Sequence, residues 1–254
     1  MALIPKNHPR AKSLLIRERL VDGFENGVVA KEGLLAHGRG EAFDYLLGEK
    51  TTKAAKKAIR AAASALILAK NPIISVNGNI TALCPKEIVQ LAKTLDAKIE
   101  VNLFYENRER RKNIVKILKK NGAKNVLGLE PKFYKRIPGL NSARRIVDKN
   151  GIYAADVVLV PLEDGDRAIS LKKLGKKVIT FDLNPLSRTA QTAHITIIDN
   201  VIRGMGELIL ACKKLSGKND ATLRKIVRHY SNKRNLSANI LEIKRNLTRR
   251  ATHG

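Results

Sequence analysis

The spacing of hydrophobic residues changes after the first 70 positions of the chain. Before that point apolar residues recur at helical spacing, which predicts helices over 9–26 and 53–70. Between them, the segment 33–49 begins apolar, and Gly38 and Gly40 predict a break before the helix resumes. The expected apolar face of the first helix is formed by Leu14, Leu15, Leu20 and Val21, and the Ala-rich helix can be capped by Thr51 and Thr52. This region is therefore expected to be mostly helical.

Further along, short apolar runs alternate with helical segments. Strands are predicted over 73–76, 98–103, 125–129, 155–166, 176–181 and 194–198, and helices over 85–95, 106–120, 167–174, 200–215, 220–230 and 235–249. Such alternation is typical of parallel βαβ units, so we expect an α/β fold with a Rossmann-like three-layer parallel sheet. Residues 131–150 are expected to be irregular. The expected organisation is a helical N-terminal region (1–70), a nucleotide-binding core (71–216) and basic C-terminal helices (217–254), all in one compact unit.

The most informative segment is 178–200, where two β-branched runs each end in polar residues. Asp182 and Asn184 follow the first run, and Asp199 and Asn200 follow the second. In open α/β sheets the ligand crevice lies beyond the carboxyl ends of the strands. A polar turn that carries Arg188 and Thr189 lies between the two runs, and its arginine indicates an anionic ligand.

Two other strand ends carry polar residues, and each allows two interpretations. Asn77-Gly78-Asn79 could hold a phosphate with backbone N–H groups at a helix N-terminus, or it could be an ordinary strand-to-helix turn. The carboxylates of Glu163, Asp164 and Asp166 could hold Mg²⁺ or orient an amine, or they could form a solvated acidic turn that caps the next helix.

The N-terminal helices offer two arginines. Arg39 lies in the sequence His37-Gly38-Arg39-Gly40, where glycines allow a ligand to approach and the arginine can bind a phosphate or carboxylate. The alternative is a helix–helix corner with a structural ion pair. For Arg17 on the first helix, a solvent-facing charge is the simpler interpretation.

The net charge of +26 raises the possibility of nucleic-acid binding. Residues 213–254 hold twelve Lys or Arg but only Asp220 and Glu242 as acids. However, no basic stretch with interleaved aromatics and no Arg-Gly repeat is present, so nucleic acid would bind non-specifically if at all. A basic composition in general, or attraction of anionic metabolites, explains the charge equally well. A nucleic-acid-binding protein on a Rossmann-like core remains the alternative function.

Several other classes lose support. The chain has no P-loop and no G-x-G-x-x-G after a strand, which disfavours enzymes that use NAD or S-adenosylmethionine. His8, His194, His229 and His253 have no metal-ligand spacing. Cys84 and Cys212 form no Cys-x-x-Cys motif and fit a reduced cytoplasm. No signal-peptide core or bilayer-length apolar run is present, so we expect a soluble cytoplasmic protein.

Taken together, several blocks resemble the archaeal 4-phosphopantoate–β-alanine ligase family, also called phosphopantothenate synthetase. The similarity runs in unbroken order from about residue 4 to 210, and the last 40 residues carry no matched motif. The blocks are IPKNHPRAKSLLIRERL, AKEGLLAHGRGEAFDYLLGE, NPIISVNGN, IEVNLFYENRERR, RIPGL, ADVVLVPLEDGDR and FDLNPLSRTA with ITIIDN.

The resemblance implies ATP-dependent amide synthesis in coenzyme A formation. ATP would activate 4-phosphopantoate as an acyl-adenylate, and β-alanine would then displace AMP to give 4′-phosphopantothenate, with pyrophosphate as the other product. The family is Rossmann-like and homodimeric. Its ATP contacts fall on Arg17, Arg39, Asp182, Leu183, Asn184, Arg188, Thr189, Asp199 and Asn200.

Other assignments rest on physical argument alone. Mg²⁺ is expected on the triphosphate, held partly by ATP itself and by no confident protein ligand. We place the phosphopantoate pocket near Asn77, Gly78, Asn79 and Arg136, and either Asp164 or Asp166 could attract the β-alanine ammonium. The catalytic residue is not defined by the sequence, and its candidates are Arg17, Arg39 and Asp164.

Overall fold

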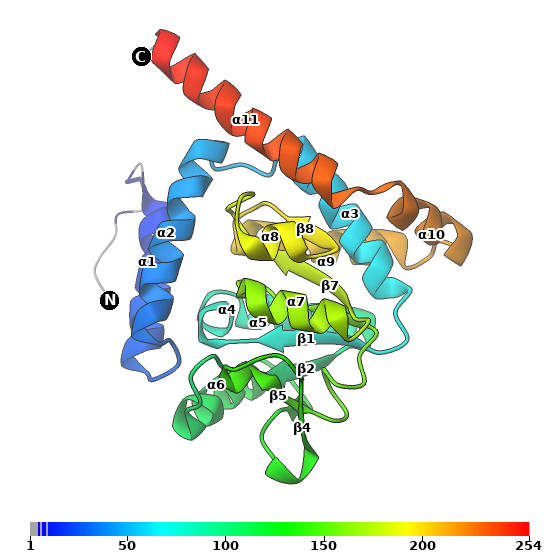
Figure 1. Ribbon diagram of the computed structural model, residues 1–254. Helices are drawn as coiled ribbons and strands as arrows, with labels where there is room; N and C mark the ends of the chain where they lie inside the picture. Colours follow the sequence, from blue (N-terminus) through cyan, green and yellow to red (C-terminus); the bar gives the residue numbers. More distant parts are fainter. Residues whose placement is uncertain (1–4, 6, 9, 254) are drawn as a thin grey trace.

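The β-branched runs of the chain form one parallel sheet in the computed structural model, which describes residues 5, 7, 8 and 10–253 (Figure 1). Six strands lie in the order β3-β2-β1-β6-β7-β8, and every pairing between them is parallel. Their bounds are β1 Pro72–Val76, β2 Lys98–Val101, β3 Val126–Leu127, β6 Val157–Leu159, β7 Lys177–Phe181 and β8 Ile195–Ile197. The predicted α/β class with a three-layer parallel sheet is confirmed.

The central strands bury side chains on both faces of the sheet, as expected for a parallel sheet between two helical layers. In β1, Ile74 joins the larger core cluster and Ile73 joins the second cluster on the other face. Leu159 and Val158 divide in the same way along β6. Two layers of helices are therefore required to cover the sheet.

The two helical layers are unequal. The larger layer contains α3 (Lys53–Ile67), α5 (Pro85–Leu95) and α9 (Val201–Leu215), which supply apolar residues to the larger core cluster. The opposite face is covered by α7 (Gly165–Lys173), which packs beside α8 (Arg188–Thr192). The helix α6 (Arg108–Lys120) contributes Ile114 and Leu118 near the β2–β3 edge.

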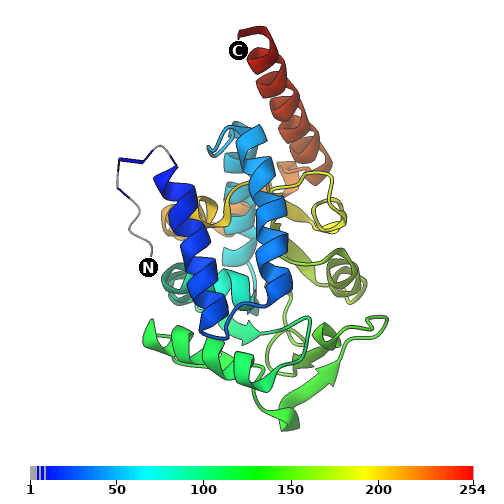
Figure 2. The same ribbon diagram turned by 90° about the vertical axis from the view of Figure 1, so that its left-hand side faces the viewer.

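An antiparallel pair of N-terminal helices crosses the carboxyl ends of the strands, as Figure 2 shows in blue. These are α1 (Ala11–Glu25) and α2 (Lys31–Leu47), and both contact α4 (Gly78–Leu83), which directly follows β1. The predicted break at Gly38 and Gly40 is wrong, because α2 is one continuous helix. Two helical glycines cost about 1 kcal/mol each, and packing of α2 against α4 and α11 overrides this penalty.

The apolar face predicted for α1 is only partly correct. Leu20 is buried, but Leu15 and Val21 are exposed. The buried side instead runs through Ile16, Leu20 and Gly23. At Gly23 the helix packs so closely against Val29 that an added Cβ would lie 2.8 Å from the valine side chain. The packing partner, rather than the apolar content of the helix alone, therefore selects its buried face.

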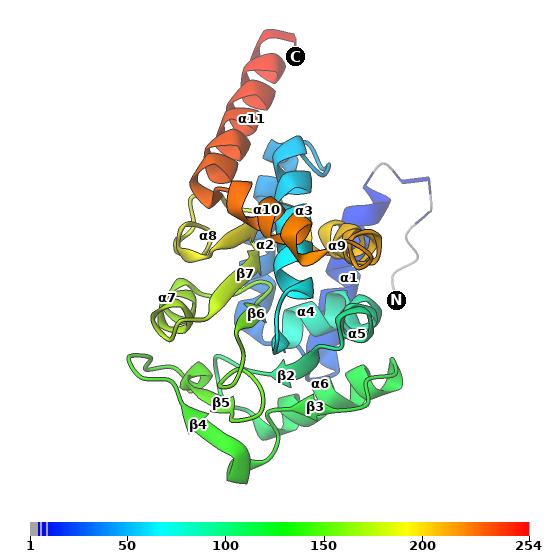
Figure 3. The same cartoon turned by 90° about the vertical axis from the view of Figure 1, so that its right-hand side faces the viewer.

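The segment 131–150 is more regular than predicted. It contains an antiparallel hairpin of β4 (Tyr134–Arg136) and β5 (Ile146–Asp148), with short 3₁₀ helices at Pro131–Phe133 and Ala143–Arg145. The hairpin lies at the end of the molecule opposite the C-terminal helix (Figures 1 and 3). Periodicity failed here because three-residue strands are too short to show alternation. The short helices α4 and α8 were missed for the same reason.

The chain closes with α10 (Asp220–His229) and α11 (Asn232–His253), which pack against α3 (Figure 3). Leu223 of α10 and Leu236 of α11 are buried, whereas Leu241 and Leu247 of α11 are exposed. None of the helices in the described ranges has the length and apolar character that a membrane crossing requires.

Candidate functional site

The carboxyl ends of β7 and β8 lie beneath α2, and this brings Arg39 to the first predicted strand end. The charge of Arg39 acts on Asp182, and a Cβ at Gly40 would lie 4.0 Å from the Leu183 side chain. Arg39 itself is exposed. An exposed cation of α2 therefore lies near the Asp182 carboxylate, and the glycine beside it on α2 faces Leu183.

The turn after β7 holds Asp182 in a fixed position. Its carboxylate accepts hydrogen bonds from the Ser187 hydroxyl and from the Asn184 backbone N–H, the latter at 2.9 Å. Burial raises the pKa of Asp182, although these hydrogen bonds and the charge of Arg39 partly oppose the change. Asn184 Oδ1 accepts from the Leu186 N–H at 2.9 Å. A rigid turn of acceptors results, typical of sites that bind ribose or base donors.

The next part of the site is the N-terminus of α8, where Ser187 is the cap. Arg188 is exposed and forms an ion pair with Asp166 at the start of α7. Thr189 is buried, and its hydroxyl donates to the Glu163 carbonyl at 3.0 Å. Arg188 and Thr189, which the sequence predicts as neighbouring site residues in one turn, thus connect the strand ends of β6 and β7.

The second predicted strand end forms a closed network with α2. Asp199 accepts hydrogen bonds from the Thr51 hydroxyl at 2.6 Å and from Arg203 Nε at 2.9 Å. Arg203 also donates to Asp44 of α2 at 2.7 Å, and Asn200 donates to the same carboxylate at 3.2 Å. Burial raises the pKa of Asp199, with Thr51 and Arg203 opposing this effect. Although burial alone would lower the pKa of Arg203, its bonds to Asp44 and the charge of Asp199 raise it.

Sequence reasoning missed Arg203 and Asp44 as members of this cluster. Arg203 lies four residues after Asp199 on a helix that begins at Val201, and i,i+4 spacing is a recognisable pairing signal. The contact with Asp44 spans 159 positions and leaves no local signal. The closed network, which we call the β8 cluster, comprises Thr51, Asp44, Asp199, Asn200 and Arg203.

Arg17 faces α2 without touching the two strand ends. Its guanidinium forms an ion pair with Glu41 at 3.2 Å, and the Tyr45 hydroxyl donates to the same carboxylate. His37 lies close enough to feel the charges of Glu41 and Arg17, and burial lowers its pKa. The helix–helix corner considered around Arg39 is absent because α2 is continuous, and Glu41 instead pairs with Arg17 of α1. Arg17 would have to leave Glu41 to contact a nucleotide.

The Asn77-Gly78-Asn79 turn makes structural contacts on all three residues. Asn77 caps α4 and donates to the Leu162 carbonyl at 3.1 Å, while Asn79 donates to Gly33 of α2 at 2.7 Å. A Cβ at Gly78 would lie 2.1 Å from the Val28 carbonyl oxygen, so only glycine fits there. This turn therefore fixes β1 to α2 and to the β6 strand end.

The acidic turn after β6 caps a helix but is not simply solvated. Asp164 caps α7 by accepting a hydrogen bond from the Arg167 N–H at 2.9 Å, and Glu163 forms ion pairs with Arg144 and Arg167. Both arginines are buried, at 7% and 1% relative exposure. Burial lowers the pKa of Arg144 to about 9 and that of Arg167 to about 10. We call Glu163, Asp164, Arg144 and Arg167 the β6 cluster.

Neither buried arginine was singled out in the sequence. Arg144 lies in the segment expected to be irregular, and Arg167 is one of the many basic residues of a +26 chain. The arginine that had been chosen, Arg136, is exposed on β4 and lies on the hairpin rather than in either cluster. Its backbone pairs with Ile146. The arginines paired with the acidic turn are Arg144 and Arg167, and Arg136 is not one of them.

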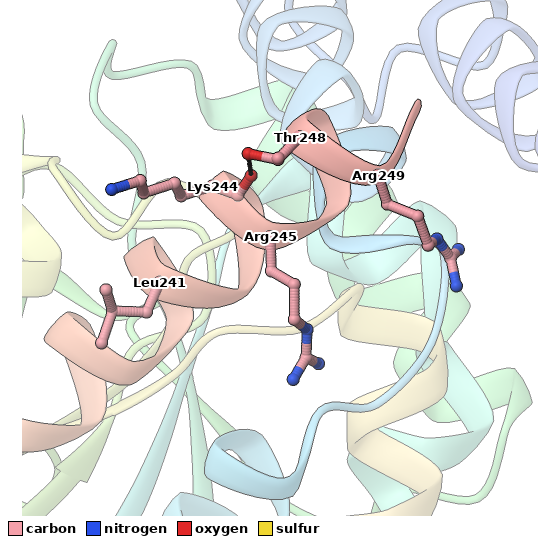
Figure 4. Close-up of a pocket in the computed structure, with 5 residues that line it drawn as sticks. All are labelled: Leu241, Lys244, Arg245, Thr248 and Arg249. Atoms are coloured by element: carbon pink, nitrogen blue, oxygen red, sulfur yellow. Dashed lines mark hydrogen bonds between the residues drawn. The ribbon is translucent and has the colours of Figure 1, made fainter. Parts of the chain in front are cut away.

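Two further features bear on ligands. Within the described residues, no group of three or more His, Cys, Asp or Glu is placed to hold a metal ion. A shallow hollow is lined by Leu241, Lys244, Arg245, Thr248 and Arg249 (Figure 4). These side chains all come from α11, and the Thr248 hydroxyl donates back to the Lys244 carbonyl at 3.1 Å. The hollow is therefore separate from the strand-end site.

Comparisons with known proteins give a consistent result. The family model described as "Phosphopantothenate/pantothenate synthetase" matches residues 54–246. A 4-phosphopantoate–β-alanine ligase of Thermococcus kodakarensis is 51% identical over 100% of this chain and 97% of its own length. Ligases of the same name from Thermococcus onnurineus and Methanosarcina mazei are each 49% identical, over 100% and 97% of this chain. The similarity extends past residue 210, so the C-terminal limit drawn from the motifs was too short.

Proposed function

The chain belongs to the phosphopantothenate/pantothenate synthetase family, and from this premise we propose that it is an ATP-dependent ligase that joins 4-phosphopantoate to β-alanine in coenzyme A biosynthesis. The observation that carries the proposal is the position of Arg39 of α2 above the Asp182 turn. A cation and fixed acceptors at parallel strand ends suit a nucleotide. The relatives with this activity match nearly the entire chain.

We assign the ATP site to the edge formed by the ends of β7 and β8. The Asp182 carboxylate and the Asn184 amide would accept hydrogen bonds from ribose or from the adenine amino group. Arg39 and Arg188 would bind phosphates through charge-assisted hydrogen bonds, with the Thr189 hydroxyl beside them. Leu183 would contact the nucleotide, and Arg17 would join the site by leaving Glu41. Asp199 and Asn200 complete the assignment.

The proposed chemistry has two steps. A carboxylate oxygen of 4-phosphopantoate attacks the α-phosphorus of ATP, and pyrophosphate leaves. The β-alanine amine then attacks the acyl carbon, AMP leaves, and the amine loses a proton to give the amide. Arginines can stabilise the charge that develops on the α-phosphoryl group in a pre-organised site. Catalysis of this kind depends on positioning and needs no covalent nucleophile.

Mg²⁺ is proposed as the counter-ion of the triphosphate, bound mainly by ATP oxygens and water. Magnesium commonly binds in this way beside phosphates. The carboxylates of the acidic turn already have partners, since Glu163 and Asp164 bond to arginine and Asp166 pairs with Arg188. Asp166 is the most exposed of the three and could exchange Arg188 for the β-alanine ammonium.

We propose a homodimer, as in the resembled family, and a cytoplasmic location. The exposed leucines of α11, Leu241 at 64% and Leu247 at 51%, offer apolar area for a subunit contact. Cys84 and Cys212 are buried and unpaired, which suits a reducing compartment. Light scattering during size-exclusion chromatography would test the dimer, and a monomeric mass at micromolar concentration would contradict it.

The reaction is tested by its products. AMP and pyrophosphate should both accumulate over many turnovers only when 4-phosphopantoate and β-alanine are supplied together. Formation of ADP and inorganic phosphate would refute the adenylate step. A wild-type protein that makes no amide product would refute the ligase function itself.

The ATP assignment is tested at Arg39. Arg39→Ala should lower kcat/KM at least 100-fold, about 2.7 kcal/mol of transition-state stabilisation, because a phosphate-binding cation is lost. The thermal unfolding midpoint should stay within a degree or two, since Arg39 is exposed. Lys31→Ala, which removes another exposed cation of α2, is the matched control and should retain full activity. Wild-type rates in Arg39→Ala would remove this residue from the site.

A further inference from the structure

The helix that carries Arg39 is anchored at its C-terminal end. All 17 residues of α2 are described by the structure, and only Asp44 and Leu47 among them are buried. Leu47 joins a small core cluster beneath the helix. The earlier half of α2 is held by polar contacts that are not fully buried, such as that of the Asn79 amide with the Gly33 carbonyl. The part of α2 near the Asp182 turn therefore has no buried side chain of its own to fix its position.

The anchor at Asp44 is a cation shared between two carboxylates. Nη2 of Arg203 donates to Asp44 at 2.7 Å and to Asp199 at 2.5 Å. The Asp199 side chain has 0% exposure, and its second oxygen accepts the Thr51 hydroxyl at 2.6 Å. Two buried carboxylates repel each other, and a buried charge is tolerated only when it is paired. The position of α2 against the end of β8 therefore depends on Arg203.

A helix transmits the position of its anchor to the rest of its length. Arg39 lies five residues before Asp44, about 7.5 Å along the helix axis. Gly40 lies one turn before Asp44 on the same face, and a Cβ there would be 4.0 Å from Leu183. The Arg39 side chain is exposed and has no hydrogen-bond or ion-pair partner within the described ranges. Its location relative to the Asp182 turn is therefore set by the helix and not by contacts of its own.

We propose that Asp44 and Arg203 are positioning residues, which hold α2 so that Arg39 lies at the Asp182 turn, an inference that rests on the proposed ATP site. Neither residue has to touch the nucleotide. A displacement of about 1 Å caused by a change far from the reacting atoms can cost up to 100-fold in rate. Loss of this anchor should therefore weaken ATP binding, and it should do so only through Arg39.

A double-mutant cycle tests this dependence. Calorimetric titration of ATP with Mg²⁺ into the full-length protein, without acid or amine substrate, measures binding without turnover. Asp44→Asn, which removes the charge and keeps the size, should raise the dissociation constant by about fivefold or more, and Arg39→Ala by about tenfold or more. The double variant should bind no more weakly than Arg39→Ala alone, because the two residues act on one contact.

Two further variants make the cycle interpretable. Glu32→Gln is the matched control, since it removes another carboxylate of α2 that is exposed and has no side-chain partner among the described residues. Its dissociation constant should equal that of the wild type. Arg203→Lys keeps the charge but loses the fork that reaches both carboxylates, and it should show the same dependence on Arg39. This variant replaces Asp44→Asn if circular dichroism shows that Asp44→Asn does not fold.

Two results would overturn the proposal. The first is an unchanged dissociation constant for ATP in a folded anchor variant. The second is additive weakening in the double variant, which would mean that Asp44 acts on the nucleotide without Arg39. Both results leave the ATP site intact, because the wild type still binds ATP and forms the amide. A wild type that binds no ATP would instead refute the proposed ATP site, and the proposal with it.

Discussion

The ends of β6 and β8 carry the same kinds of side chains in two different states. Each has a buried carboxylate paired with arginine at the carboxyl edge of the sheet. The β6 cluster adjoins the proposed ATP site, and the β8 cluster includes two residues assigned to it. In the β8 cluster Asp199 and Arg203 have partners from Thr51 and Asp44. In the β6 cluster two arginine Nε atoms lack hydrogen-bond partners. The first cluster has its hydrogen bonds complete as folded, and the second does not.

This difference predicts different costs of substitution in the two clusters. A satisfied buried network loses stability when one member is removed, because the remaining charges stay buried and unpaired. A network with unmet donors already carries that cost, which functional sites often do. Substitutions in the β8 cluster should therefore lower the free energy of unfolding more than substitutions in the β6 cluster.

The largest expected effect is that of Arg203→Ala. This substitution leaves the carboxylates of Asp44 and Asp199 buried without their shared cation. The free energy of unfolding should fall by about 3–4 kcal/mol. Urea denaturation measures the loss, and Arg203→Lys should recover part of it. A loss below 1 kcal/mol would show that the β8 cluster is not the stabilising one.

The next effect is on the pH dependence of stability and comes from Glu100, a buried acid next to the β6 cluster. Among the described residues, backbone N–H groups rather than arginine side chains donate hydrogen bonds to its carboxylate. Burial raises its pKa to about 7, while backbone N–H groups of Ile152 and Asp148 and the charge of Arg167 oppose this. The folded state therefore binds more protons than the unfolded state between pH 4.5 and about 7, so stability should fall as pH rises through this range. The shift corresponds to roughly 3 kcal/mol.

Unfolding free energies of wild type and Glu100→Gln across this pH range test the effect. The glutamine does not titrate, so the wild-type protein should lose stability relative to it as pH rises. Glu130→Gln, at an exposed carboxylate paired with Lys132, is the control and should follow the wild type. Parallel curves for wild type and Glu100→Gln would show that this carboxyl group has an ordinary pKa.

The smallest effect on stability should come from Arg188→Gln. Its ion pair with Asp166 is two-thirds exposed on both sides, and such pairs contribute about 0–1 kcal/mol. Unfolding should change by less than 0.5 kcal/mol. If Arg188 binds phosphate, the KM for ATP should nevertheless rise about tenfold. This is the factor that corresponds to the loss of one charge-assisted hydrogen bond of about 1.4 kcal/mol. Unchanged steady-state kinetics would exclude Arg188 from the ATP site.

The sequence predicted features that depend on neighbouring residues. Thr52 caps α3 as expected, and the parallel strands follow from β-branched runs separated by helices. It also identified the strand ends at Asp182 and Asp199, because strand ends are local and their meeting at one edge follows from parallel topology. The ligand contacts assigned there remain predictions.

Contacts between distant segments could not be predicted from local pattern. The sequence makes Thr51 a candidate helix cap, but its hydroxyl donates to Asp199, 148 positions away. Arg144 enters the β6 cluster from a 3₁₀ helix in a segment that shows no periodicity. Such side chains are typical of solvated surfaces, and folding buries Arg144 and half-buries Thr51.

The arginine shared by Asp44 and Asp199 links two motions. Asp44 belongs to the helix that carries Arg39, and Asp199 belongs to a strand end proposed to bind ATP. If nucleotide binding changes the interaction between Arg203 and Asp199, it also changes the packing of α2 through Asp44. The two free-energy changes are then equal, because coupling between two equilibria is reciprocal. Occupancy of the strand ends and closure of the helix above them would then be a single cooperative transition.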